Sequence, residues 1–499
     1  MRINSKLITV IAIIFIGALI ITGRKSFVKP NQQIEILRTS FRAINQLPDP
    51  AMIDTAGKWY LLNHISTPLI EFDLKNTSLL PMIAKSWKIQ DNKYILNLNP
   101  EAKFSDGTSI RARDVVASIK RIVIKKSSLH FPLWKHVADC ENLKSMNDPC
   151  QGILGDDATG IVEITLKAKS ESFLLQISSP EGGIWSSDDI DANTLELKPS
   201  KFSGPYSLSN LTVNENKELI LIRNPYSLIQ KKFPESPKEI WIRSMPRSEI
   251  EKSIAERNSD VFIGDYIPFN EYDWDKMDVG VHYSTPSSVN YFYNLNSKKK
   301  IGMDLLYELA KFSDKHINFA QTVLPITPSI ALSKSEIETL LPKKSDPVIS
   351  IAAPSFYYKD GTLDFIKEAA GKVGIKVEIT KLDMAEFFEL RNVDENYKTK
   401  YDFLLSNYVA SERYPAVQLR FITGNRKAAV DLNDIESPDQ DQSKINRLKE
   451  YQRWLISSQL VVPFYFTRSH IVYSNKLDIG SQPLTDAEIQ LWRITKTVD

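Results

Sequence analysis

The sequence predicts an α/β protein with more than one domain, and three observations support this. The chain has 499 residues, enough for about three domains of ordinary size. Hydrophobic residues make up 42% and charged residues 25%, values of a folded globular protein rather than a disordered chain or a polytopic membrane protein. Residues 348–379 read strand, helix, strand at the spacing of a β-α-β unit, which requires a parallel sheet.

The first half of the chain contains a hairpin followed by a helix. Residues 86–98 alternate polar and apolar side chains on either side of Asp91, which predicts a β-hairpin with a tight turn. Residues 112–125 carry apolar side chains at helical spacing, so a helix follows. Residues 218–226 predict a strand that ends in a turn at Asn224.

The alternation continues after the β-α-β unit. Asp383 and Glu386 have the spacing of a capping box at the start of a further helix, and residues 401–409 supply another strand. This second half is therefore predicted to be an α/β domain. The polar, acidic segment 431–447 is typical of a solvated loop that leads into a helix.

The N-terminus resembles an export signal. Arg2 and Lys6 precede an uncharged stretch of 17 residues at 7–23, the pattern of a Sec signal. No small-x-small site closes the stretch cleanly, and 17 residues is the lower limit for crossing a bilayer, so residues 1–30 are either a cleaved signal or an uncleaved membrane anchor. A buried core helix fits poorly because every face is apolar. Either way the folded part is predicted to be periplasmic or otherwise extracytoplasmic.

Cys140 and Cys150 are the two cysteines of the chain, with nine residues between them. In an exported protein such a pair is predicted to form a local disulfide, worth about 2 to 3 kcal/mol. A zinc site with His130 and His136 is the alternative. The disulfide is favoured over it because the order and spacing match neither CxxC nor HxxxH ligand pairs.

Catalytic signatures are missing from the sequence. It contains no GxSxG elbow, P-loop, GxGxxG after a strand, HExxH or CxxC pair. His64 and His470 lie among apolar residues, which is typical of structural histidines. The net charge of +2 provides no field to attract nucleic acid. We therefore predict no enzymatic activity, no cofactor and no nucleic-acid partner.

Five segments in order along the chain carry a family resemblance: LNHISTPLIEFD (62–73), PMIAKSWKI (81–89), KFSDGTSIRARDVVASIKRI (103–122), SGPYSL with NPY (203–208 and 224–226) and VNYFYNLNSK (289–298). Together they resemble the family 5 extracellular solute-binding proteins, the peptide-, nickel- and opine-binding components of bacterial ABC importers. The resemblance spans roughly residues 34–475. Gly107 permits a turn with positive φ, and Gly204 followed by proline sets a rigid strand entry.

The resemblance implies a two-lobed periplasmic-binding-protein fold with a hinge between the lobes and an extra subdomain in the first lobe. The implied division is lobe I from 33–58, 195–284 and 469–499, the extra subdomain from 59–194, and lobe II from 285–468. Arg111 occupies a helix N-cap position where the family usually has threonine, which predicts the loss of a cap worth about 1 kcal/mol. Residues 301–320 are shorter than the family's segment, so lobe II is predicted to be abbreviated.

The resemblance also implies a ligand site in the cleft between the lobes. The expected contacts from the first lobe are Leu47, Pro48 and Asp49, and those from the second lobe are Tyr408, Ala410, Ser411 and Glu412. Peptide-binding relatives have an acidic residue at the position of Ser411, where it pairs with the α-amino group. A serine cannot neutralise a buried ammonium, so either Glu412 replaces it or the ligand is a sugar, a metal chelate or another amphiphilic solute.

The implied function is that of a monomeric solute-binding protein, which captures a peptide-like or other small polar solute and delivers it to an ABC transporter permease in the inner membrane. One alternative is a degenerate binding scaffold, tethered to the membrane or free, that serves as an interaction or sensing module. An exported enzyme with an unrecognised site is a further alternative, but no nucleophile and base stand in a known arrangement.

Overall fold

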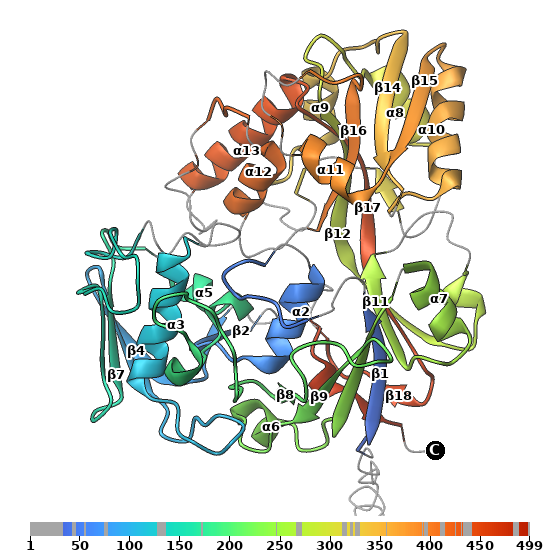
Figure 1. Cartoon of the computed structure of the whole chain (residues 1–499). Helices are drawn as coiled ribbons and strands as arrows, with labels where there is room; N and C mark the ends of the chain where they lie inside the picture. Colours follow the sequence, from blue (N-terminus) through green and yellow to red (C-terminus); the bar gives the residue numbers. More distant parts are fainter. Residues whose placement is uncertain are drawn as a thin grey trace, which may run out of the picture.

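The protein folds into two lobes that share one sheet. The computed structural model describes residues 33–497 apart from 42–45, 54–55, 74–77, 127–135, 171–172, 246, 266–271, 312–316, 320–322, 325–329, 356, 392, 394–397, 410–414, 425, 431, 433–441 and 483–488. In this part of the chain an eleven-stranded sheet has the order β15-β14-β16-β12-β17-β11-β1-β10-β9-β8, with β13 paired to β17. Figure 1 shows β12 and β17 running from the lower, first lobe into the upper, second lobe.

The first lobe contains the β8 to β11 end of this sheet and its covering helices. Its elements are β1 (Ile36–Phe41), α2 (Ala56–Ile65), β8 (Tyr206–Leu208), β9 (Glu218–Arg223), α6 (Leu228–Lys232), β10 (Glu239–Ser244), α7 (Arg247–Ala255), β11 (Val261–Asp265), η3 (Trp274–Lys276), β18 (Leu477–Asp478), η6 (Leu491–Arg493) and β19 (Thr495–Lys496).

A second group of elements in the first lobe contains a four-stranded sheet, of order β4-β5-β7-β6, and a separate two-stranded sheet of β2 and β3, and packs beside α2 (Figure 1). These elements are β2 (Ile70–Asp73), β3 (Ser78–Pro81), β4 (Ala84–Gln90), β5 (Lys93–Leu98), α3 (Ala112–Ile124), β6 (Ile153–Asp156), β7 (Ile161–Thr165), α5 (Phe173–Gln176), η1 (Pro180–Gly182) and η2 (Ser187–Asp189).

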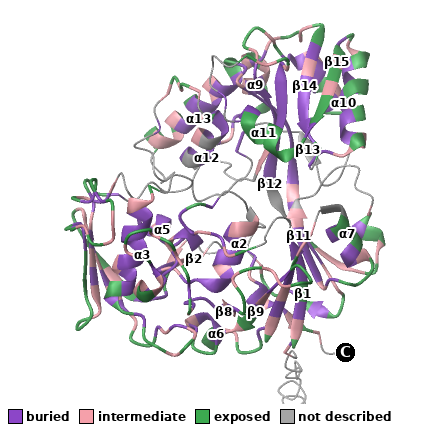
Figure 2. Cartoon of the chain, in the orientation of Figure 1, coloured by how far each residue is buried: buried purple, intermediate pink, exposed green. Residues whose placement is uncertain are grey.

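The second lobe contains the β15 to β12 end of the large sheet, with helices on both faces. Its elements are β12 (Gly280–Asn294), α8 (Met303–Leu309), β13 (Ile317–Phe319), α9 (Lys334–Leu340), β14 (Val348–Pro354), α10 (Asp360–Lys372), β15 (Lys376–Leu382), α11 (Met384–Arg391), β16 (Phe403–Val409), α12 (Pro415–Thr423), α13 (Gln442–Ser457) and β17 (Val461–Tyr473). Figure 2 shows the central strands largely buried and an outer face of α10 exposed.

The elements predicted from local patterns are confirmed. The hairpin is β4 and β5, with Asp91 in the turn at φ 54°, and the helix that follows is α3. The β-α-β unit is β14, α10 and β15, with the two strands parallel. At the start of α11, Glu386 accepts a hydrogen bond from the Asp383 N–H and donates its own N–H to Asp383, which is the predicted capping box.

The start of α3 differs in part from the prediction. The Arg111 side chain makes no cap hydrogen bond, as expected. The Asp114 carboxylate, however, accepts the Arg111 N–H at 2.9 Å and the Ser187 N–H at 2.9 Å. An acidic group in the first turn also interacts favourably with the helix dipole, so the helix start is stabilised from inside the helix instead of by its N-cap side chain.

Steric constraints require glycine at both positions singled out in the sequence, Gly107 and Gly204. Gly107 has φ +86°, which L side chains rarely adopt. A Cβ on Gly204 would lie 2.3 Å from the carbonyl carbon of Ile65, so only glycine lets this strand entry approach the end of α2.

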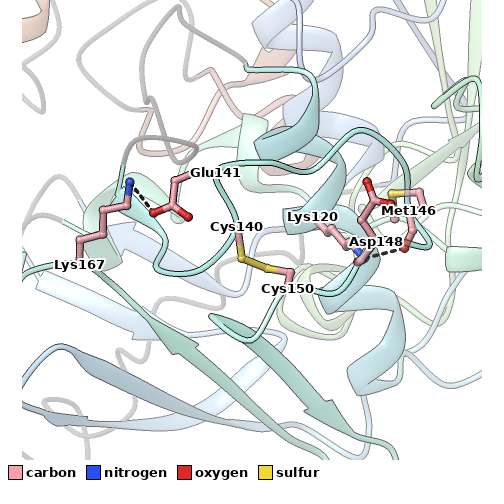
Figure 3. The surroundings of a disulfide bond; sticks show 7 residues. All are labelled: Lys120, Cys140, Glu141, Met146, Asp148, Cys150 and Lys167. Atoms are coloured by element: carbon pink, nitrogen blue, oxygen red, sulfur yellow. Dashed lines mark hydrogen bonds and ion pairs between the residues drawn. A yellow bond between two sulfur atoms is a disulfide. The ribbon is translucent and has the colours of Figure 1, made fainter.

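The predicted disulfide between Cys140 and Cys150 is present, so both sulfur atoms are bonded to each other rather than available as zinc ligands. Figure 3 shows the loop beside it, held by Lys120 of α3. The Lys120 ammonium donates to the Met146 carbonyl at 2.6 Å and also to the Asp148 carbonyl. The disulfide thus closes the loop on itself, and the two hydrogen bonds from Lys120 hold the loop against α3.

Replacing both cysteines by serine is expected to lower the free energy of unfolding by about 2 to 3 kcal/mol, because the unfolded chain regains the entropy of a short loop. Urea unfolding at pH 7 measures the loss. A small dithiol reductant should produce the same loss in the unsubstituted protein and none in the double variant. Equal stabilities with and without reductant would contradict the prediction.

No helix in the described part of the chain is long and apolar enough to span a bilayer. The apolar stretch 7–23 lies outside the described residues.

Candidate functional site

The strand order of the second lobe reverses beside β14. From β14 the chain passes through α10 to β15 on one side, and from β15 through α11 to β16 on the other, with all three strands parallel. The apolar residues of α10 and α11 belong to different core clusters. In open α/β sheets, ligands bind outside the carboxyl ends of the strands at such a reversal, so this edge is the candidate site of the second lobe.

This edge of the sheet faces the first lobe. The carboxyl end of β16, at Val409, pairs with Ser288 of β12. The start of β12, at Gly280, pairs with Tyr473, which also pairs with Val261 of β11 in the first lobe. Because β16 runs antiparallel to β12, the end of β16 lies towards the first lobe.

Tyr408 lies at this end of β16 and is partly buried. Burial raises the pKa of its hydroxyl well above the ordinary value, and the neighbouring Tyr291 raises it further. Ala410, Ser411 and Glu412 follow directly but lie outside the described residues. Their expected ligand contacts therefore stay predictions.

Two tyrosines at the same edge were not among the residues predicted from the sequence. Tyr357 and Tyr358 follow β14 and are buried, and the Tyr358 hydroxyl lies 2.9 Å from both Asn290 Oδ1 and the Ser406 carbonyl oxygen. This contact links the loop after β14 to β12 and β16. The sequence could have indicated these two tyrosines, because both lie just after the first strand of the predicted β-α-β unit.

In the first lobe, Leu47, Pro48 and Asp49 line one cavity of about 390 Å³. The structure thus brings the three predicted first-lobe residues together. The remaining lining residues come from α3 and from the segment after η2: Arg121, Lys125, Thr194, Glu196 and Leu197.

Two cations, Arg121 and Lys125, hold the Asp49 carboxylate in the lining of the cavity. Its Oδ1 and Oδ2 each accept a hydrogen bond from the Arg121 guanidinium at 2.8 Å, and Oδ2 also accepts one from Lys125 at 2.8 Å. Burial alone raises the pKa of Asp49, but the hydrogen bonds and charge of Arg121, aided by Lys125 and the Ala51 N–H, lower it to about 2. The carboxylate is therefore ionised and already neutralised within the protein.

A tight turn, 191–196, supplies Thr194 and Glu196 to the cavity lining and contains a residue at positive φ. The Asp191 carboxylate accepts the N–H groups of Asn193 at 2.9 Å and Thr194 at 2.7 Å. Leu195 has φ +59°, a conformation that is unfavourable for a bulky L residue. Its carbonyl oxygen accepts a hydrogen bond from Arg121 Nε at 2.8 Å, so contacts to the rest of the lobe hold the turn in this shape.

Leu195→Gly is expected to raise the free energy of unfolding by about 1 kcal/mol, because glycine adopts positive φ without steric cost. Chemical denaturation measures the gain. Leu197→Gly is the matched control, because Leu197 packs against the first-lobe core and its truncation should destabilise the protein. A loss of stability in both variants would show that Leu195 is not strained.

Within the described residues no group of three or more histidine, cysteine, aspartate or glutamate side chains is placed to hold a metal ion.

A two-lobed α/β fold with long strands that cross between the lobes is the architecture of the periplasmic-binding-protein fold. Residues 78–317 match the family model for bacterial extracellular solute-binding proteins, family 5 Middle, so the resemblance predicted from the sequence is confirmed. The periplasmic murein peptide-binding protein MppA of Escherichia coli (strain K12) is 24% identical over 243 residues, which cover 46% of this chain and 44% of MppA. The alignment thus spans less than half of that relative.

Solved structures show the fold over nearly the whole chain. The E. coli murein tripeptide binding protein MppA superposes with a TM-score of 0.70 at 15% identity and covers 94% of this chain and 100% of its own. The oligopeptide-binding protein OppAIV of Borrelia burgdorferi gives 0.69 at 16%, covering 92% and 99%. NikA of Brucella suis, in complex with Fe(III)-EDTA, gives 0.67 at 13%, covering 92% and 99%.

Proposed function

We propose that this chain is the extracytoplasmic solute-binding protein of an ABC import system, and that it captures a peptide-like or other small polar solute between its lobes and delivers it to a membrane permease. The match of residues 78–317 to the family 5 solute-binding proteins carries this proposal. The names of MppA and OppAIV, murein peptide- and oligopeptide-binding proteins, support a peptide-like ligand. The protein acts as a monomer, and residues 1–30 export it as a cleaved signal or retain it as an anchor.

The two walls described above are the proposed ligand contacts. Leu47 to Asp49 form the first-lobe wall, and the edge at Tyr358 and Tyr408, continued by 410–412, forms the second-lobe wall. A ligand that touches both walls binds the closed state more tightly than the open one, so it shifts the lobes towards closure by that difference in affinity.

The proposed lobe I comprises residues 33–58, 195–284 and 469–499, with 59–194 as its extra subdomain. The proposed lobe II comprises residues 285–468.

The charge of the first-lobe wall constrains the ligand. A peptide with a free amino group needs a counter-charge where it is buried, and Asp49 cannot supply one because both its oxygens are bound by Arg121 and Lys125. With serine at 411, Glu412, the next residue in the sequence, is the acidic candidate predicted for the second lobe. Recognition of a free amine therefore depends on Glu412.

Native mass spectrometry of the protein purified without denaturation, followed by thermal shifts with peptides, sugars and metal chelates, tests the proposal. A ligand at 100 times its Kd adds about 2.7 kcal/mol to stability, a shift of a few degrees. An N-acetylated copy of any active peptide is the matched control, and it should lose its shift if Glu412 pairs with the amine. An empty protein with no shift in all three classes would overturn the importer function and favour the degenerate scaffold.

A further inference from the structure

Three separate segments of the first lobe meet at one side chain, that of Arg121 on α3. Its two terminal nitrogens donate to the two carboxylate oxygens of Asp49 at 2.8 Å each, and its Nε donates to the Leu195 carbonyl at 2.8 Å. The side chain is only 3% exposed. Because a guanidinium is planar and its donors form a rigid fork, these three bonds fix Asp49 and Leu195 relative to each other.

Each segment held by Arg121 is internally tied by its own hydrogen bonds. In the loop 46–53, Asp49 accepts the Ala51 N–H on Oδ1 at 2.9 Å, and its carbonyl accepts the Met52 N–H at 2.9 Å. In the turn 191–196, the Asp191 N–H donates to the Glu196 carbonyl at 2.9 Å. Asp49 and Glu196, one from each segment, both line the cavity, so the position of Arg121 sets the separation of two cavity walls.

We propose that Arg121 is a positioning residue that couples the loop 46–53 to the turn 191–196 and thereby sets the shape of the first-lobe wall of the ligand site. Its effect on ligand binding rests on the proposed function. The coupling itself does not, because it is a property of the hydrogen bonds within the lobe.

The neighbouring residue on α3 supplies a matched control. Lys120 donates to the carbonyls of Met146 and Asp148 in the disulfide loop (Figure 3) and does not line the cavity. Lys120→Met therefore removes a buried cation from the same helix and loosens the disulfide loop without breaking any of the three Arg121 hydrogen bonds of the coupling.

Hydrogen exchange of the full chain tests the coupling without a ligand. Asp49→Asn is expected to speed exchange of the Leu195 and Glu196 amides about tenfold or more, although among the described residues the hydrogen bonds that link Asp49 to the turn run through Arg121. In an Arg121→Lys background the same substitution should add no further change in the turn. Lys120→Met should speed exchange only around 140–150. A change confined to 46–53 in Asp49→Asn, or the same turn response in Lys120→Met, would overturn the coupling.

Binding of tri-alanine, measured well below the unfolding temperature, tests the consequence for the ligand site. Arg121→Lys is expected to weaken tri-alanine binding about tenfold, while Lys120→Met leaves it within about twofold. Unchanged affinity in Arg121→Lys would overturn the positioning role. If tri-alanine fails to bind the unsubstituted protein, that result counts against a peptide ligand, and the exchange experiment still decides the coupling.

Discussion

Asp49→Ala is expected to lower the free energy of unfolding by about 3 to 5 kcal/mol. The Arg121 side chain is 3% exposed and that of Asp49 27%, so the substitution leaves a buried guanidinium that has lost two of the three hydrogen bonds described above. Urea unfolding at pH 7 measures the effect.

Two further variants separate the cost of leaving the Arg121 charge buried without a partner from the cost of losing the contact itself. In the double variant Asp49→Ala with Arg121→Ala the buried guanidinium is gone, and Lys125, the other cation bound to Asp49, has a side chain that is 22% exposed, so the second substitution should cost less in this background than alone. The surface pair Lys198 and Glu196 is the matched control, with side chains 71% and 56% exposed, and Glu196→Ala should cost less than about 1 kcal/mol. A cost that small for Asp49→Ala would show that the Arg121 contact is not a buried ion pair in solution.

The helices and strands that were predicted correctly are those whose hydrophobic pattern lies within a short stretch of sequence. The hairpin of β4 and β5, the helix α3 and the unit of β14, α10 and β15 follow from periods of two and 3.6 residues within short windows. The disulfide followed in the same way, because its two cysteines are close in sequence and residues 1–30 resemble an export signal.

Contacts between distant residues could not be predicted in this way. Asp49 and Arg121 are 72 residues apart, and Tyr358 and Asn290 are 68 apart, so no local period links them. Asp49 lines the first-lobe cavity, and its expected contact with a ligand stays a prediction. The hydrogen bonds from Arg121 and Lys125 to the Asp49 carboxylate appear only in the folded chain. Because they already neutralise the carboxylate, it holds the cavity wall in place instead of neutralising a ligand.

Two buried ionisable residues of the first lobe give opposite contributions to the pH dependence of stability. His64 is 0% exposed, with Nδ1 2.8 Å from the Tyr60 carbonyl and Nε2 accepting the Leu491 N–H at 3.2 Å. Burial lowers the pKa of His64 to about 4, against 6.5 in the unfolded chain. The unfolded state therefore binds a proton first as the pH falls, and acidification from 6.5 to 4 costs about 3 kcal/mol through His64 alone.

Glu181 acts in the other direction. Its side chain is buried, and Oε1 has no hydrogen-bond partner among the described residues. Burial raises the pKa of Glu181 to about 8, against 4.5 in the unfolded chain. The folded state keeps a proton that the unfolded state releases, so stability is lost as the pH rises from 4.5 to 8. Glu181→Gln, which is neutral in both states, should therefore be about 3 kcal/mol more stable than the unsubstituted protein at pH 7.

Between pH 4.5 and 6.5 the proton gained by unfolded His64 is matched by the proton lost from unfolded Glu181, so the two contributions to the pH slope cancel in the unsubstituted protein. Glu181→Gln removes the contribution of Glu181 to the pH slope and leaves that of His64. Its stability should then fall by about 1.4 kcal/mol for each pH unit of acidification in this window, and adding His64→Gln should restore a flat profile. Urea unfolding at half-unit pH steps measures both slopes. Parallel profiles for Glu181→Gln and the unsubstituted protein would mean that Glu181 ionises in the folded state as it does in the unfolded one, and that a cation or water outside the described contacts stabilises its charge.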